Sequence, residues 1–313
     1  MTLLNILLVS LQLMTMLKCR TAVPVAEVSE SKSIPVENIA APEEKPDYQL
    51  ETVMKLPEVL TECSGMAKLG HDRLVALNDS GNKPYLYIFS EKDKKDVRTV
   101  KVSGVKNNDW EELASDDKNI YVGDFGNNGG TRQNLMVYKI SKEDLLKSDE
   151  VKPEIISFRY DGQTKFNDSN RHNFDCEAMI CKGDSLFLFS KNRGDFRTDV
   201  YGLPKAVGEH IATKMGSFDS EGLITGADFI SKGNGGALAL VGYSIHGKAF
   251  YPFILYFPDV QSSRFLDGPV ERIKFDQVLQ TETIIFHDSN DVYLTNEEED
   301  GSDGRIYKVH LKN

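Results

Sequence analysis

The sequence predicts an all-β fold built from one four-strand unit that is repeated five times. The 313-residue chain contains many short apolar runs bounded by Gly, Asn, Asp and Pro, and no long stretch with helical periodicity. Hydrophobic residues make up 40% of the chain, which is enough to build a buried core. One pattern of polar and apolar residues recurs five times in the same order, and such self-similarity is typical of repeat architectures.

Each predicted unit opens with a strand that carries a polar residue near its start. These first strands are 62–69, 109–116, 175–182, 224–231 and 281–288. A strongly apolar second strand follows in every unit, over 73–78, 119–124, 185–191, 236–243 and 291–297. After a turn comes the third strand, over 85–90, 135–141, 199–204, 252–257 and 305–311.

A fourth, more polar strand closes four of the units, over 97–104, 154–161, 210–217 and 271–278. The fifth unit has no such strand, whereas an additional strand at 48–55 precedes the first unit. Pairing this strand with the last unit would close a ring of five sheets and protect their edges, so we expect a five-bladed β-propeller. A six-bladed ring is the alternative, although no sixth apolar strand pair is found. Segments 141–153 and 162–173 read as insertions.

The N-terminal residues predict export. Residues 3–17 form an uncharged, mostly apolar run with the length of a signal-peptide core, so we expect a signal peptide over 1–18. Residues 19–47, rich in Pro, Ala, Glu and Ser, are expected to form a flexible acidic tether before the propeller domain at 48–313. Lipidation of Cys19 and cleavage after Ala26 are alternatives, so the protein is expected to be secreted, or extracytoplasmic and anchored as a lipoprotein.

The charge balance narrows the class of partner. There are 48 Asp and Glu against 37 Lys and Arg, a net charge of −11. This argues against nucleic-acid binding and against a polybasic membrane patch, because an acidic chain offers no basic surface to phosphates or anionic lipids. The chain is also expected to be a monomer, and its only membrane contact would be a lipid on Cys19. The other cysteines, Cys63, Cys176 and Cys181, are expected to be buried thiols rather than disulfides.

The equivalent polar residues of the five first strands predict a calcium site. First strands line the channel of a propeller, so the ring consists of Ser64, Glu111, Glu177, Thr225 and Glu282. Three carboxylates that converge on one axis repel one another and are costly to bury, and a hard cation removes that cost. Calcium prefers six to eight oxygen ligands, which suits this ring. A hydrated channel without an ion is the alternative.

The turns after the second strands should crowd the same channel mouth. Asp79 and Asp124 lie in two of these turns and are candidates to orient or deprotonate a water molecule. Candidate ligands for an anionic substrate are Asn127, Arg132, Lys191, Arg193 and Arg197. An Arg beside a metal is what a phosphate ligand requires. Alternatively, these cations neutralise the acidic residues of neighbouring turns.

The motifs ECSGMA, DWEELA followed by NIYVGDFGNN, and TETIIF resemble the calcium-activated nucleotidases, which are apyrases with a five-bladed propeller fold. The resemblance covers roughly residues 60–300. It implies a secreted enzyme that holds one calcium through the ring residues, and hydrolysis of nucleoside di- and triphosphates with Lys191 and Arg193 near the phosphate. The first-blade turn departs from the family pattern, because Asn78 to Gly81 contains no Arg.

The phrases SGMA with LNDSGN, DWEELA with GDFGNN, and DCEAM with SKNR are similar to a group of bacterial secreted or surface propellers, some of whose relatives carry phytase-like or esterase-like labels. The sequence therefore favours a calcium-dependent hydrolase of phosphoanhydride or phosphoester bonds. The alternative is a non-catalytic, surface-tethered propeller with a structural calcium, whose rim binds a glycan or a protein.

Overall fold

The computed structural model describes residues 48–70, 72–167, 169, 171–297 and 303–312. The predicted signal peptide and tether, together with Cys19, lie outside these residues. Within the described part of the chain, no helix has both the length and the apolar character needed to cross a bilayer.

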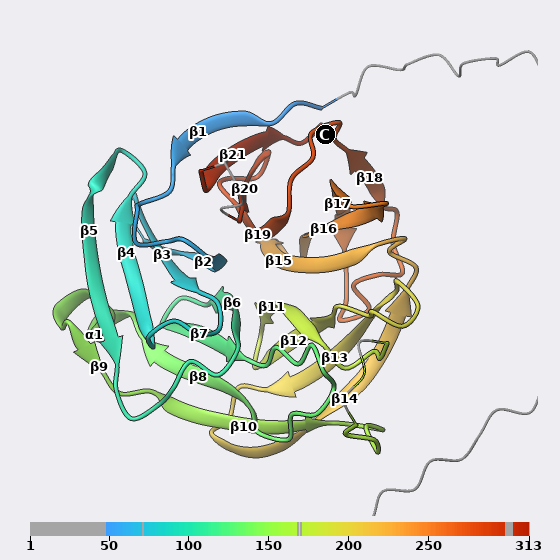
Figure 1. Cartoon of the computed structure of the whole chain (residues 1–313), viewed down its shortest axis with the longest axis horizontal. Helices are drawn as coiled ribbons and strands as arrows, with labels where there is room; N and C mark the ends of the chain where they lie inside the picture. Colours follow the sequence, from blue (N-terminus) through green and yellow to red (C-terminus); the bar gives the residue numbers. More distant parts are fainter. Residues whose placement is uncertain (1–47, 71, 168, 170, 298–302, 313) are drawn as a thin grey trace, which may run out of the picture. The chain divides into compact units, whose positions relative to one another are not determined.

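Five four-stranded units follow one another around a ring (Figure 1). The first blade contains β2 (Cys63–Gly70), β3 (Arg73–Asn78), β4 (Tyr85–Ser90) and β5 (Asp93–Val102). The second contains β6 (Trp110–Ser115), β7 (Asn119–Asp124), β8 (Leu135–Ser141) and β10 (Glu154–Tyr160). The third contains β11 (Cys176–Lys182), β12 (Ser185–Ser190), β13 (Thr198–Pro204) and β14 (Gly208–Phe218). The fourth contains β15 (Leu223–Lys232), β16 (Gly235–His246), β17 (Ala249–Val260) and β18 (Glu271–Lys274). The fifth contains β19 (Thr281–Phe286), β20 (Asp291–Asn296), β21 (Arg305–His310) and, from the start of the domain, β1 (Glu51–Lys55).

The ring closes as the sequence predicts. Strand β1 pairs antiparallel with β21, from Glu51 opposite Lys308 to Lys55 opposite Arg305. The inner strands contact one another in cyclic order, from β2 to β6, β11, β15 and β19 and back to β2. This confirms the all-β propeller and its closure by an N-terminal strand. No sixth inner strand occurs among the described residues.

Two features depart from a simple repeat, one in the first insertion and one between two outer strands. The first insertion forms a short helix, α1 (Lys142–Lys147), which Ser141 caps by accepting a hydrogen bond from the backbone N–H of Asp144, and then a two-stranded pairing of β9 (Glu150–Val151) with β5. In addition, β10 and β14 pair in parallel, which joins the second and third blades into one eight-stranded sheet. The sequence analysis predicted neither feature.

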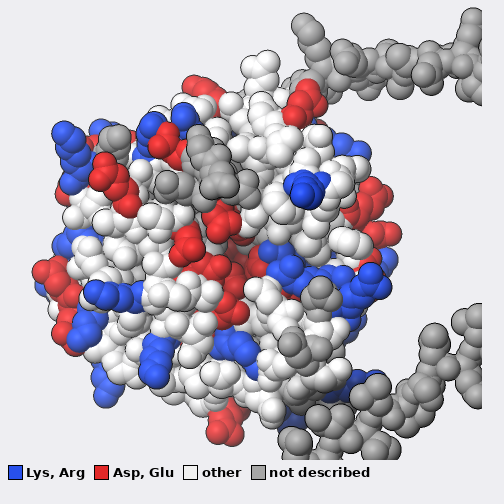
Figure 2. Space-filling model, in the orientation of Figure 1, with Lys and Arg blue, Asp and Glu red and all other residues white. Residues whose placement is uncertain are grey.

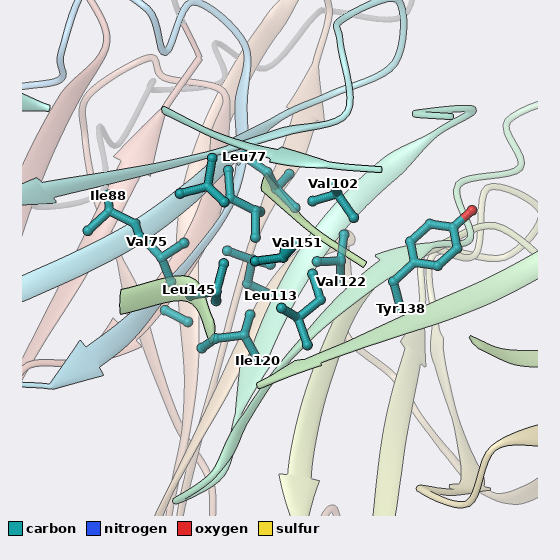
Figure 3. Close-up of a cluster of buried hydrophobic side chains, with 14 of the residues drawn as sticks. Val75, Leu77, Ile88, Val102, Leu113, Ile120, Val122, Tyr138, Leu145 and Val151 are labelled. Atoms are coloured by element: carbon teal, nitrogen blue, oxygen red, sulfur yellow. The ribbon is translucent and has the colours of Figure 1, made fainter. Parts of the chain in front are cut away.

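The core lies between neighbouring blades. Between the first and second blades, Val75 and Leu77 from β3 pack with Ile120 and Val122 from β7, and Leu145 of α1 completes the layer (Figure 3). Alternation along each strand sends every second side chain into such a layer, so the blades are held face to face by burial of apolar surface. The three described cysteines are free thiols; two are buried and Cys181 is partly exposed.

Candidate functional site

A β-bulge occurs at the same place in all five inner strands. In β6, Trp110 pairs with Asp124 and Glu112 with Gly123, so Glu111 is the extra residue between them. The register skips in the same way in β2, β11, β15 and β19. The extra residues are Ser64, Glu111, Glu177, Thr225 and Glu282, the five ring residues selected from the sequence. Bulges re-aim side chains, and all five are buried at the channel.

In two blades the residue after the bulge is a glycine that packs against the backbone of the neighbouring inner strand. A Cβ on Gly65 would lie 2.9 Å from the backbone of Glu112, and one on Gly226 would lie 2.8 Å from the carbonyl oxygen of Glu282. Glu112 occupies this position in the second blade. Its carboxylate accepts hydrogen bonds from the backbone N–H groups of Leu113 (2.8 Å) and Ala227 (3.1 Å). Because Ala227 lies on β15, which does not neighbour β6, the Glu112 side chain spans the channel.

One mouth of the channel holds a polar cavity of about 230 Å³. Figure 2 shows it as an acidic hollow at the centre of the ring face, with Lys and Arg side chains beside it. Its lining includes seven residues predicted from the sequence: Ser64, Asp79, Glu111, Glu177, Lys191, Arg193 and Glu282. Three further lining residues, Asn128, Tyr243 and Glu297, belong to the segments after the second strands that were expected to crowd this mouth. Three others were not predicted: Glu62, Cys63 and Gln280. Five predicted residues do not belong to the lining: Asp124, Asn127, Arg132, Arg197 and Thr225.

The two ring residues that carry a hydroxyl group, Ser64 and Thr225, bond to neighbouring inner strands. Ser64 donates to the carbonyl of Trp110 at 2.9 Å, and Thr225 donates to the carbonyl of Thr281 at 2.7 Å. In this arrangement they tie β2 to β6 and β15 to β19.

Three carboxylates form a cluster, and two of them, Asp79 and Glu111, line the cavity. One oxygen each from Asp79, Asp109 and Glu111 lies within 4.8 Å of the others. Glu111 is 4% exposed, and no described residue donates a hydrogen bond to its carboxylate. Burial, followed by the charge of Glu177 and those of the neighbouring aspartates, raises the pKa of Glu111 well above its usual value. Burial, and then the charge of Asp79, raises the pKa of Asp109 to about 6. A bound cation would relieve this repulsion.

Gly126 is the residue that lets two of these carboxylates approach the chain. A Cβ at this position would lie 2.0 Å from Oε1 of Glu111 and 2.6 Å from Oδ2 of Asp109. Any larger side chain would push both groups away. The glycine-rich segment after β7 therefore serves the acidic cluster through a close backbone approach.

Lys191 lines the same cavity. It is 4% exposed, its ammonium pairs with Glu177, and it lies 5.3 Å from the ring centre of Tyr243. Burial lowers the pKa of Lys191, but the charges of Glu177, Tyr243 and Glu282 outweigh burial and hold that pKa well above its usual value. Lys191 is therefore a buried cation close to Glu177 and Glu282, two of the acidic residues expected from the sequence to bind calcium.

Arg193 extends this cationic wall. Its Nε donates to Asp175 at 2.8 Å, one terminal nitrogen donates to the side-chain oxygen of Asn128, and the same nitrogen lies 3.5 Å from Glu177. Asp175 is fully buried and also accepts the backbone N–H of Asn127 at 2.8 Å. The cavity is thus lined by Asp79 and Glu111 from the acidic cluster and by two cations, Lys191 and Arg193, that are paired with acidic residues.

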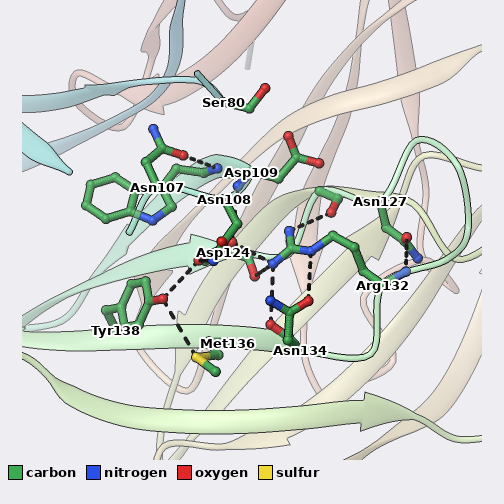
Figure 4. A network of polar contacts seen from close by, with 12 residues as sticks. Ser80, Asn107, Asn108, Asp109, Asp124, Asn127, Arg132, Asn134, Met136 and Tyr138 are labelled. Carbon is green, nitrogen blue, oxygen red and sulfur yellow. Dashed lines mark hydrogen bonds and ion pairs between the residues drawn. The ribbon is translucent and has the colours of Figure 1, made fainter. Parts of the chain in front are cut away.

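Asp124 and Arg132 lie beside Asp109 of the acidic cluster (Figure 4). The carboxylate of Asp124 accepts hydrogen bonds from Arg132 (2.7 Å), Tyr138 (2.9 Å) and Asn108 (2.8 Å). It also accepts the backbone N–H of Asp109 at 3.2 Å, so the pair supports the turn that carries Asp109. The pairing of Arg132 with Asp124 matches the alternative in which the candidate cations neutralise acidic residues of the turns.

Sequence reasoning missed Asp109. The signal was present, since an acidic residue stands two positions before the ring residue in three units, at Glu62, Asp109 and Asp175, but only the ring position of each first strand was considered. Gln280, which stands two positions before Glu282, was missed for the same reason. Gln280 donates to Glu282 at 2.7 Å and also bonds to Glu297.

No family model matches the chain, and no curated protein matches it. Among solved structures, a glucose dehydrogenase aligns with 84% of this chain and 100% of its own, at 8% identity and a TM-score of 0.48. An α-L-arabinofuranosidase from Podospora anserina aligns with 85% of this chain and 97% of its own, at 11% identity and a TM-score of 0.45. A β-fructofuranosidase from Bombyx mori aligns with 83% of this chain and 61% of its own, at 11% identity and a TM-score of 0.44. These similarities are too low to indicate a function. The propeller fold implied by the resemblance to the apyrases is present, but an apyrase identity is not supported.

Proposed function

We propose that this chain is a calcium-dependent hydrolase of phosphoanhydride or phosphoester bonds, exported from the cell, with its active site in the axial cavity. The observation that carries the proposal is that one cavity is lined both by two members of a three-carboxylate cluster, Asp79 and Glu111, and by the cations Lys191 and Arg193. A phosphate ester bound to calcium needs both, because the metal and the cations share the charge of the phosphate oxygens.

The acidic cluster suits calcium by its chemistry. Asp79, Asp109 and Glu111 offer only oxygen ligands, which hard cations prefer. Glu111 is the strongest candidate, since it is buried and lacks a described hydrogen-bond donor. In this proposal Asp79 is a metal ligand rather than a catalytic base, and Glu177 is a partner of Lys191 rather than a calcium ligand.

The chemistry assigned to the side chains is simple. Bound calcium would neutralise the cluster and draw phosphate oxygens toward it. Lys191 and Arg193 donate hydrogen bonds to non-bridging phosphate oxygens. Glu282, 8% exposed and held by Gln280, accepts a proton from the attacking water. The water oxygen bonds to phosphorus, the bridging P–O bond breaks, and the leaving oxygen takes a proton from solvent.

One observation favours the non-catalytic alternative. Lys191 and Arg193 already pair with Glu177 and Asp175, so their charge is compensated inside the protein. A cation alone would then complete the cavity, and the rim would bind a glycan or a protein partner without turnover.

Phosphate release separates the two. The protein is incubated with ATP, ADP, pyrophosphate or p-nitrophenyl phosphate in calcium and in chelator, beside Glu111→Gln and the control Glu209→Gln, an exposed residue on β14. Release that needs calcium, is lost in Glu111→Gln and is kept in Glu209→Gln supports the hydrolase. Full release in chelator overturns it, and calcium-dependent melting without release indicates the non-catalytic module.

A further inference from the structure

The second insertion, which the proposed chemistry does not use, lies against the cavity wall. Residues 161–174 contact two loops of the ring face, namely 125–130 after β7 and 191–195 after β12. His172 lies where the insertion meets both loops, and one residue of each loop, Asn128 and Arg193, lines the cavity.

His172, Asn128 and Arg193 form a closed circuit of hydrogen bonds. The Nε2 of His172 bonds to the backbone carbonyl of Asn128 at 3.0 Å. The side-chain oxygen of Asn128 accepts from a terminal nitrogen of Arg193. The backbone N–H of Arg193 returns to the carbonyl of His172 at 3.1 Å, and Gly194 donates to the same carbonyl at 3.2 Å. Each member of the circuit therefore fixes the other two.

The hydrogen bonds also define the tautomer of His172. Its Nδ1 accepts the backbone N–H of Phe174 at 3.1 Å, so the proton lies on Nε2, which donates to Asn128. The ring packs against Gly130, which has a φ of +71°, and a Cβ at this glycine would lie 3.0 Å from Cδ2 of His172. Both ring nitrogens and the Cδ2 edge of the His172 imidazole are therefore in contact with neighbouring residues.

We propose that His172 is a positioning residue that holds Arg193 against Asn128 and so orients the guanidinium toward the cavity. Asp175 holds only the Nε side of that guanidinium, whereas Asn128 holds a terminal nitrogen. Without the His172 bond, the loop that carries Asn128 keeps its links to Gln163 and Ser169 but loses the one at Asn128, and Arg193 gains freedom to turn outward. The effect on anion binding rests on the proposed function, whereas the effect on Arg193 itself does not.

The test reads Arg193 directly through its modification by phenylglyoxal, followed residue by residue by peptide mass spectrometry. The readout is the rate at Arg193 divided by the rate at Arg98, a guanidinium on β5 with 32% side-chain exposure that makes no contact with the loop 125–130, so that general loosening cancels. His172→Leu removes the donor, and His172→Gln retains an amide that can donate to Asn128. His210→Leu is the matched control, because His210 also bonds through Nε2 to a backbone carbonyl, that of Ala206, and lies outside the cavity.

We expect the ratio to rise at least threefold in His172→Leu and to stay within twofold of wild type in His172→Gln and His210→Leu. An unchanged ratio in His172→Leu, or an equal rise in His172→Gln, overturns the proposal.

As a second readout, inorganic phosphate in calcium should bind five- to tenfold more weakly to His172→Leu, with calcium affinity unchanged. If the wild-type protein binds no phosphate in calcium, the proposed function fails, while the Arg193 ratio still decides the role of His172.

Discussion

Replacing Gly126 by alanine tests the acidic cluster with the smallest perturbation that the chain offers. The new Cβ would lie 2.0 Å from Oε1 of Glu111, whereas an ordinary contact begins at 3.4 Å, so the carboxylate must retreat by the difference. The carboxylate of Asp109 must move as well, from 2.6 Å. The backbone of Gly126 has no positive φ, so alanine fits the chain itself.

The expected cost is a loss of calcium affinity. Metal–ligand distances must be held to within about 0.2 Å, and two of the three carboxylates would be displaced by more than that. Changes to groups that orient metal ligands typically cost about 10–100-fold in affinity. We therefore expect Gly126→Ala to bind calcium at least tenfold more weakly, which is about 1.4 kcal/mol per factor of ten.

Isothermal titration with calcium measures this change, and calcium-dependent melting supports it, because a ligand at 100 times its Kd should stabilise the folded state by about 2.7 kcal/mol. Gly216→Ala on β14 is the control, since a Cβ there meets nothing within 4 Å. If Gly126→Ala keeps its fold and binds calcium within twofold of wild type, Asp109 and Glu111 are not calcium ligands.

Three further predictions concern stability. Gly65→Ala brings a Cβ to 2.9 Å from the backbone of Glu112 and should cost about 1–3 kcal/mol in urea unfolding; an unchanged midpoint would mean that the inner strands can separate freely. Lys191→Met leaves Glu177 buried without its cation and should cost about 3–5 kcal/mol at pH 8, with a smaller loss at low pH; equal stability at pH 8 would show that the pair is dispensable. Burial raises the pKa of Asp228 from 3.8 to about 6, so the folded state holds this proton more tightly than the unfolded state and stability falls as pH rises through that window. Asp228→Asn should therefore flatten the pH dependence of unfolding between pH 4 and 6, and parallel curves for the two proteins would contradict the assignment.

The sequence by itself determined the blades and the ring of inner-strand residues. Strand alternation and turn residues are local signals, so each strand could be located from its own segment, and the missing fourth strand pointed to closure by residues 48–55. The same register argument selected Ser64, Glu111, Glu177, Thr225 and Glu282, because equivalent positions of a repeat must face the same axis.

Only the tertiary structure decided how those positions are used. The bulges depend on pairing between two strands, and the place of Lys191 close to Glu177 and Glu282 depends on blades that are far apart in the chain. Glu112 occurs in a single unit, so no repeat could reveal that it spans the channel. Asp109 has acidic equivalents in Glu62 and Asp175, but only the fold brings its carboxylate together with those of Asp79 and Glu111. Local periodicity specifies which residues reach the axis, whereas burial and charge among residues brought together by the ring decide which of them pair and which, in the proposed function, bind a cation.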